Sequence, residues 1–88
     1  MLDNNIQLLI LAELQQAARK FNNREVSIND YLCTDLIEFW HYNDVYEDKA
    51  NYIWIYTDTD DYDTANKKVE KILRVIRGEE FIEGGEFR

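Results

Sequence analysis

Two segments with a helical spacing of apolar residues, one near each end of the chain, enclose a middle segment whose residues favour strands. In residues 3–22 the apolar side chains recur at intervals of three and four, at Ile6, Leu9, Ile10, Leu14, Ala17, Ala18 and Phe21. The same spacing recurs in residues 64–77, at Ala65, Val69, Ile72, Leu73 and Ile76. Because this spacing gathers apolar residues on one face of a helix, we expect two amphipathic helices with a β-rich segment between them.

Polar residues at the ends of both segments support these helices. Asp3 or Asn4 can accept hydrogen bonds from the first backbone N–H groups, and residues 22–23, both asparagine, can end the helix in a left-handed turn. Asp63 is the expected N-cap of the second helix, and Gly78 follows its last apolar residue.

The middle of the chain contains two runs rich in aromatic and branched residues, Leu36–Tyr42 and Tyr52–Thr57. Such residues fit a pleated surface, and a polar connection over residues 43–51 separates the runs, so an antiparallel hairpin is expected. In the second run, isoleucines alternate with aromatic residues, which places the two kinds on opposite faces. One face is expected to pack on the helices. The candidate contact surface is the face of Tyr52, Trp54 and Tyr56.

The sequence leaves open whether residues 28–42 are helical or extended. Ser27 and Asp30 resemble a capping box, which favours a short helical turn at residues 28–33. The composition of Leu36–Tyr42 favours a strand instead.

Length and composition indicate one small folded domain over residues 1–88. A chain of 88 residues buries about 60–65% of its unfolded surface, so its core is small. Hydrophobic residues make up 45% of the chain and proline is absent, which argues against disorder. The expected fold class is α+β: a small single domain in which two amphipathic helices pack on an antiparallel β-hairpin or short sheet.

The net charge of −8 arises in the middle of the chain. Residues 27–63 contain ten acidic residues and one basic residue, whereas residues 1–26 contain three of each, and residues 64–88 contain five acidic and six basic residues. The middle segment also contains all six tyrosines and both tryptophans. A surface with one sign of charge attracts partners of the opposite sign, and tyrosine and tryptophan often anchor protein interfaces.

The sequence predicts a cytoplasmic protein without membrane contact. The longest apolar stretch, Leu8–Ala12, is far shorter than the roughly 20 residues of a membrane-spanning helix. Asp3 and the asparagines after it stand where a secretory signal carries positive charge. Cys33 is the only cysteine in the sequence, which excludes an internal disulfide and a cysteine-based zinc cluster and fits a reducing compartment.

No residue pattern indicates catalysis or a cofactor. A nucleophilic pair would have to combine Cys33 with His41, and no oxyanion-hole motif or glycine-rich loop accompanies them. We therefore expect Cys33 in the core, and a protein that is not an enzyme and has no cofactor.

The acidic run of residues 58–63 is the candidate for a divalent cation, because Ca²⁺ takes several carboxylate oxygens. Its acidic members are Asp58, Asp60, Asp61 and Asp63. No frame of this run has both the ligand spacing and the turn glycine of an EF-hand loop. Helix capping and solvation are therefore favoured over a metal site.

A basic stripe is expected on the exposed side of the second helix. Its members are Lys67, Lys68, Lys71 and Arg74. Such a stripe is a usual footprint of nucleic-acid binding, but a protein with a net charge of −8 repels a phosphate backbone. We expect a solvated face, with Arg74 paired to Glu70, and no direct contact with nucleic acid.

These features favour a non-catalytic inhibitor that docks an acidic surface, rich in tyrosine and tryptophan, on a basic protein that handles nucleic acid. Spaced carboxylates can replace phosphates at lysine and arginine sites. Phage anti-defence proteins, nucleic-acid mimics and nuclease immunity proteins have this general character, and the likeness is one of character alone. The residues expected to contact the partner are Asp44, Tyr46, Glu47, Asp48, Trp54, Asp58, Asp60, Asp61 and Asp63.

The alternative function is that of a structural or regulatory subunit, which forms a homo-oligomer or joins a larger assembly. Its contacts would be made by Trp40, Trp54, Phe81 and Phe87. Ionic strength separates the two functions, because salt weakens docking between charges and leaves an apolar interface intact.

Overall fold

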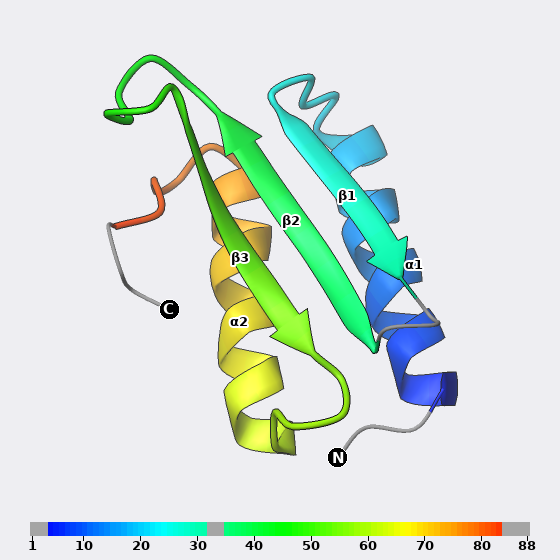
Figure 1. The fold of residues 1–88 in the computed structure, drawn as a ribbon. Helices are drawn as coiled ribbons and strands as arrows, with labels where there is room; N and C mark the ends of the chain where they lie inside the picture. The colour runs from blue at the N-terminus through cyan, green and yellow to red at the C-terminus, as the bar shows by residue number, and fades with distance from the viewer. Residues whose placement is uncertain (1–3, 32–34, 84–88) are drawn as a thin grey trace.

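The structure is a computed structural model that describes residues 4–31 and 35–83. The described chain runs from one helix through three strands to a second helix (Figure 1). The elements are α1 (Asn4–Lys20), β1 (Val26–Tyr31), β2 (Leu36–Tyr42), β3 (Ala50–Tyr56) and α2 (Tyr62–Ile76). Two helices and an antiparallel sheet confirm the expected α+β class.

The three strands form one antiparallel sheet in the order β1-β2-β3, so β2 is the central strand. Both helices lie on the same face of the sheet, α1 behind β1 and α2 behind β3 in the view of Figure 1. Within residues 4–31 and 35–83, no helix or strand covers the opposite face. The domain therefore has two layers, and its sheet is buried on one face only.

The core lies between the sheet and the two helices. In β2 and β3 every second residue is buried, beginning with Ile37 and Asn51. This is the two-residue period expected of a sheet with one covered face. The buried hydrophobic residues of both layers are Leu14, Ile37, Phe39, Tyr46, Ile53, Ile55, Ala65, Val69, Ile72, Val75, Ile76 and Ile82.

The segment whose structure the sequence left open begins with an edge strand. β1 pairs with β2 along its whole length, and Val26 and Ile28 pack against the core. A helical turn here would leave backbone groups of β2 without partners on this side. Asp30, which resembled part of a capping box, instead accepts a hydrogen bond of 3.1 Å from the side chain of Gln7 in α1.

Both helices end as expected from the sequence. α1 is followed by Asn22 in the left-handed conformation (φ 49°), and α2 is followed by Gly78 with a φ of 79°. Asparagine and glycine are the residues that adopt this conformation at the lowest cost.

The start of α2 requires a correction, because its N-cap is Asp61 and not the predicted Asp63. Asp61 has an extended backbone, and its carboxylate accepts a hydrogen bond of 2.7 Å from the N–H of Thr64. Asp63 already lies in the first turn of the helix. Hydrogen bonds from Thr64 hold the pKa of the Asp61 carboxyl below its usual value.

We predict that the two faces of β2 differ sharply in their contribution to stability. Phe39→Ala should lower the free energy of unfolding by about 3–5 kcal/mol, because it leaves a cavity in the core. Tyr42→Ala, on the open face with 49% of the residue exposed, should change it by less than about 1 kcal/mol. Urea unfolding of both variants checks this, and comparable losses would contradict the one-sided burial of the sheet.

Candidate functional site

The uncovered side of the sheet carries five aromatic residues on two adjacent strands, and we call this surface the aromatic face. Alternation along β2 and β3 places them opposite the core residues of the same strands. Two of the five are well exposed, at 49% and 40%, and the other three are partly buried against one another. The five are Trp40, Tyr42, Tyr52, Trp54 and Tyr56.

The rings of the aromatic face contact each other across and along the strands. The strand register places Trp40 opposite Tyr52, and their ring centroids are 4.8 Å apart. Tyr52 lies 4.9 Å from Trp54, which in turn lies 6.4 Å from Tyr56. These contacts hold the rings in place without any cover from a helix, so the face presents a pre-ordered surface.

Trp54 contains a polar group that its surroundings do not satisfy. Its indole N–H is covered by neighbouring atoms and has no acceptor in the described part of the chain. A buried donor without an acceptor costs about 1–3 kcal/mol.

One carboxylate, that of Glu38, lies within the aromatic face. Glu38 is on β2, directly opposite Trp54 of β3 and Asn29 of β1. Its Oε1 accepts a hydrogen bond of 2.9 Å from the indole N–H of Trp40. Alternation brings no lysine or arginine to this face in the described stretches of the three strands. Glu38 therefore supplies the charge at the centre of the surface.

One end of the aromatic face is bordered by an acidic loop, residues 43–49, which connects β2 to β3 (Figure 1). The side chains of Asp44, Glu47 and Asp48 are all exposed, as expected from the sequence. The loop is closed by a backbone hydrogen bond of 3.0 Å from Asn43 N–H to the carbonyl of Lys49. Three predicted contact residues thus lie together on one compact element.

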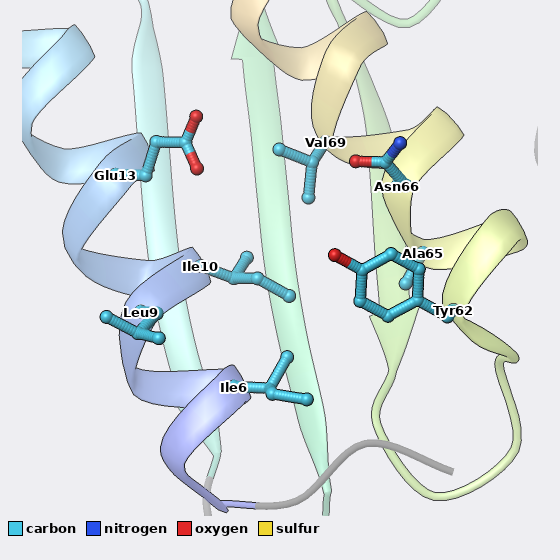
Figure 2. Close-up of a pocket in the computed structure, with 8 residues that line it drawn as sticks. All are labelled: Ile6, Leu9, Ile10, Glu13, Tyr62, Ala65, Asn66 and Val69. Atoms are coloured by element: carbon cyan, nitrogen blue, oxygen red, sulfur yellow. The ribbon is translucent and has the colours of Figure 1, made fainter.

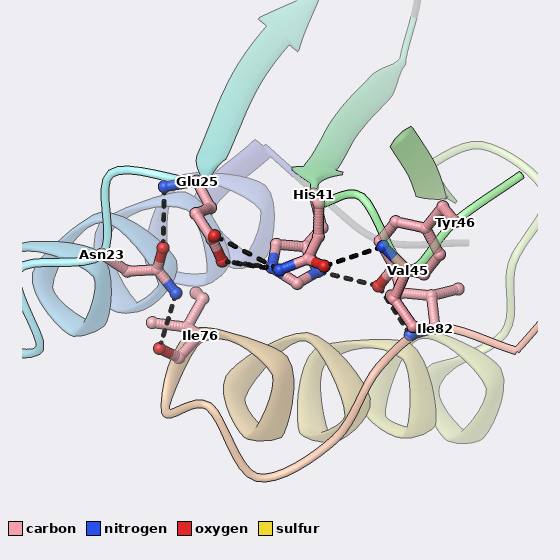
Figure 3. A network of polar contacts seen from close by, with 8 residues as sticks. Asn23, Glu25, His41, Val45, Tyr46, Ile76 and Ile82 are labelled. Carbon is pink, nitrogen blue, oxygen red and sulfur yellow. Dashed lines mark hydrogen bonds and ion pairs between the residues drawn. The ribbon is translucent and has the colours of Figure 1, made fainter. Parts of the chain in front are cut away.

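Tyr46 belongs to the same loop but points into the protein, with 8% of the residue exposed. Its hydroxyl accepts a hydrogen bond of 2.9 Å from the N–H of Ile82 and lies 2.7 Å from Nδ1 of His41 (Figure 3). Nε2 of His41 lies 3.2 Å from the carboxylate of Glu25. The Tyr46 hydroxyl and both ring nitrogens of His41 have partners in one arrangement of protons. In it the Tyr46 hydroxyl donates to Nδ1, and Nε2, which carries the ring proton, donates to Glu25.

The buried position of Tyr46 gives it a supporting role in the candidate surface. Its ring packs edge-on against those of His41 and Phe81, 5.4 and 5.9 Å away. Through its hydrogen bonds with His41 and Ile82, Tyr46 joins the acidic loop to the end of β2 and to the segment after α2 (Figure 3). We expect Tyr46 to fix the position of the exposed acids above it.

The four predicted aspartates of residues 58–63 lie at the other end of β3, beside the start of α2 (Figure 1). β3 has seven residues, so about 20 Å of strand separates them from the acidic loop. The structure therefore divides eight of the nine predicted contact residues between two separate ends of the sheet, and the ninth, Trp54, lies between them in β3. Asp58, Asp61 and Asp63 are exposed, and Asp61 also caps α2.

Asp60 pairs with Lys68 of α2 along the outer edge of β3. Nζ of Lys68 lies 2.6 Å from Oδ2 of Asp60 and donates a 2.9 Å hydrogen bond to the carbonyl of Trp54. The same Asp60 oxygen accepts a 3.0 Å hydrogen bond from the N–H of Tyr56. The pair thereby occupies backbone groups with which another strand would pair, a usual protection of an edge strand.

The expected exposed basic stripe on α2 also requires a correction. Lys68 and Lys71 are buried, with 4% and 3% of each residue exposed. Lys71 lies 3.4 Å from a carboxylate oxygen of Glu80, which also pairs with Arg74. Arg74 therefore pairs with Glu80 and not with the expected Glu70, because the chain after α2 folds back along the helix. Of the four bases, Lys67 is exposed as predicted, and the other three are paired with carboxylates of the protein.

A groove lies in the helix layer, between α1 and α2. Its volume is about 270 Å³, and apolar side chains of both helices line it. Figure 2 shows Ile6 and Ile10 of α1 pointing towards Tyr62 and Val69 of α2. Tyr62 is 66% exposed at this groove, so it provides a tyrosine outside the aromatic face for comparison.

Residues 4–31 and 35–83 contain no group of three or more His, Cys, Asp or Glu side chains that could hold a metal ion. Of the pair considered for nucleophilic catalysis, His41 is buried and bonded as above, and Cys33 lies outside the described residues. Phe87, a residue of the alternative assembly, also lies outside them.

Sequence reasoning missed two members of the candidate surface, Glu38 and Tyr42. The signal that identifies them is the two-residue period of β2, because both share the parity of Trp40.

We predict that the Asp60–Lys68 pair is structural. Asp60→Ala should cost about 3 kcal/mol of unfolding free energy, because it leaves the buried ammonium of Lys68 without its partner. Asp58→Ala, which removes an exposed carboxylate two residues away, should stay within about 0.5 kcal/mol. Equal small effects in urea unfolding would show that the pair does not protect the β3 edge.

A further prediction concerns how the contribution of Tyr46 to the free energy of unfolding changes at alkaline pH. Burial raises the pKa of the Tyr46 hydroxyl, so the folded protein keeps it protonated where the unfolded chain, with a pKa of about 10, ionises it. Near pH 8, Tyr46→Phe should cost about 1–3 kcal/mol, since His41 Nδ1 and Ile82 N–H lose their partner. The difference between wild type and variant should shrink as the pH rises above about 10. A difference that is constant from pH 8 to 11 would contradict the buried position.

None of the described helices has the length and apolarity needed to cross a membrane. No family model matches the chain, and neither the curated proteins nor the solved structures contain a match to it. Inferences about function therefore depend on the geometry of the aromatic face and its acidic borders.

Proposed function

We propose that this protein is a non-catalytic binding protein that docks its aromatic face and acidic loop on a basic surface of another protein. By occupying that surface it would act as an inhibitor, in the manner of a nucleic-acid mimic or an anti-defence protein. The observation that carries the proposal is a sheet face on which β2 and β3 place five aromatic residues and a central carboxylate, with no covering element in the described chain.

The size of the aromatic face indicates how far the interface extends. Three strands of up to seven residues form a face about 23 Å long and about 14 Å wide, or roughly 300 Å². A stable interface buries about 800 Å² on each partner. Contact must therefore continue past the sheet, and the acidic loop at its end is the adjacent exposed element. The interface then has an aromatic centre and a charged rim, as protein interfaces commonly do.

The charge distribution supports a basic partner. Glu38 lies inside the face, and Asp44, Glu47 and Asp48 border it against one base, Lys49. This distribution attracts lysine and arginine and accelerates association with a basic surface. Stacked aromatic rings on a sheet also suit nucleic-acid bases, but the negative surroundings repel a phosphate backbone. A basic protein surface is therefore the occupant that fits best.

A second copy of the chain is the other occupant to consider. Each copy carries a net charge of −8, so a face-to-face dimer would bring two acidic surfaces together. Like charges at an interface are unfavourable at low ionic strength. Dimerisation through this face should therefore appear only at high salt, where the charges are screened.

Matched tyrosine variants test this proposal in a capture experiment with the immobilised protein and lysate of the cells that produce it. Tyr42→Ala removes an exposed ring from the aromatic face, and Tyr62→Ala removes one from the helix groove. We expect wild type and Tyr62→Ala to retain the same basic protein at roughly 0.1 M salt, and Tyr42→Ala to lose most of it. At 1 M salt, where the screening length falls from about 10 to 3 Å, capture should weaken for all three.

A second pair of variants separates local charge from total charge. Neutralising Asp44, Glu47 and Asp48 changes the net charge by three, and neutralising Glu13, Glu70 and Glu79, which lie in or after the helices, changes it equally. Only the first set should reduce capture at 0.1 M salt. Equal capture by both sets, or a partner that Tyr42→Ala retains, would refute docking through this surface. A salt-resistant dimer in analytical ultracentrifugation would favour the subunit function instead.

A further inference from the structure

The aromatic face has a defined centre where Glu38, Trp40 and Trp54 meet. Glu38 of β2 is the direct cross-strand neighbour of Trp54, and Trp40 follows it on the same face of β2. The ring centroids of the two tryptophans are 6.4 Å apart, with the rings tilted edge to face at 65°. A carboxylate and two indoles from adjacent strands therefore form one cluster, which we call the Glu38 cluster.

We propose that the Glu38 cluster is an arginine-selective subsite, which binds the guanidinium group of an arginine on the partner protein. The inference rests on the proposed docking of the aromatic face and adds the identity of the side chain received at its centre. A guanidinium combines a positive charge, a flat surface that stacks on indole, and N–H donors in a fork that matches a carboxylate.

The hydrogen bond within the cluster prepares the carboxylate for this role. Oε1 of Glu38 accepts the indole N–H of Trp40, which fixes the orientation of the carboxylate in the sheet face. No ion pair joins Glu38 to a lysine or arginine within residues 4–31 and 35–83. The carboxylate thus keeps acceptor positions on both oxygens for donors of a partner, since each carboxylate oxygen can accept two. A positioned acceptor loses less entropy on binding than a mobile one.

The surroundings of Glu38 favour arginine over lysine. The residues around it are aromatic, and its neighbour on β1 is the uncharged Asn29. A guanidinium is weakly hydrated and stacks on such rings, whereas an ammonium is a compact, strongly hydrated charge. When a partner closes over the face and expels water, the ammonium loses more hydration than the guanidinium. Arginine also makes two parallel hydrogen bonds to one carboxylate, which lysine cannot.

The protein already contains a contact of this kind at the border of the face. Nζ of Lys68 lies 5.1 Å from the centre of the Tyr56 ring, and Asp60 accepts its charge. That cation reaches the edge of the sheet from α2 and is fully occupied by its partners. The Glu38 cluster has the same two components, aromatic rings and a carboxylate, in the middle of the face. Its cation would come from the partner.

Two defined peptides, octaarginine amide and octalysine amide, test the selectivity. Each is titrated into the labelled protein at the same ionic strength, and the indole N–H signals of Trp40 and Trp54 are followed by NMR, with assignments from Trp40→Phe. We expect octaarginine to bind roughly tenfold more tightly than octalysine, and to shift both indole signals.

Glu38→Gln is the decisive variant, because its amide oxygen can still accept the Trp40 N–H while the charge is lost. It should bring the ratio of the two peptide affinities close to one. The matched control neutralises Asp44, Glu47 and Asp48, which should weaken both peptides and leave the ratio unchanged. Urea unfolding of Glu38→Gln confirms that the sheet remains folded.

The outcomes separate this inference from the proposed function. If both peptides shift the indole signals with equal affinity, or if Glu38→Gln keeps the arginine preference, the arginine subsite is refuted and docking through the face stands. If neither peptide perturbs the aromatic face, both the subsite and the proposed docking surface are refuted.

Discussion

The structure depends on a sheet that is packed on one face only. Because α1 and α2 lie on the same side, β2 and β3 must direct Ile37, Phe39, Ile53 and Ile55 to that side and their aromatic residues to the other. A single shift in strand register would exchange the two sets and expose the core, so the alternation fixes the fold and the surface together. The aromatic face is thus the direct counterpart of the core, built from the same strands.

Hydrogen bonds at both ends of the sheet hold the segments that border the candidate surface in place. At one end, the hydrogen bonds among Ile82, Tyr46, His41 and Glu25 hold the acidic loop beside the aromatic face. At the other end, the pair of Asp60 and Lys68 closes the edge of β3. A binding surface with a fixed border and a closed edge favours docking of side chains on its face over addition of a strand.

Periodicity allowed both helices and the hairpin to be predicted from the sequence, because their apolar spacing is strong and local. Local patterns failed where distant contacts decide the outcome. β1 is a strand because β2 needs a partner, and Lys68 and Lys71 are buried because Asp60 and Glu80 reach them from other segments. Tyr46 turns inward for the same reason, since its partner Ile82 is 36 residues away in the chain. The period of β2 places Glu38 on the face of Trp40, but its position opposite Trp54 depends on the strand register, which the sequence pattern does not give.

Both tryptophans of the protein lie on the aromatic face, so tryptophan fluorescence, excited at a wavelength that tyrosine does not absorb, reports on this surface alone. Quenching by caesium and iodide ions therefore measures the two properties on which the account depends, the accessibility of the face and the sign of its field. The account predicts that both indoles are quenched at low ionic strength, and that caesium is more effective than iodide relative to free tryptophan. Indoles that neither ion quenches, or that iodide quenches better, would show that the face is covered or is not acidic, and would contradict the account.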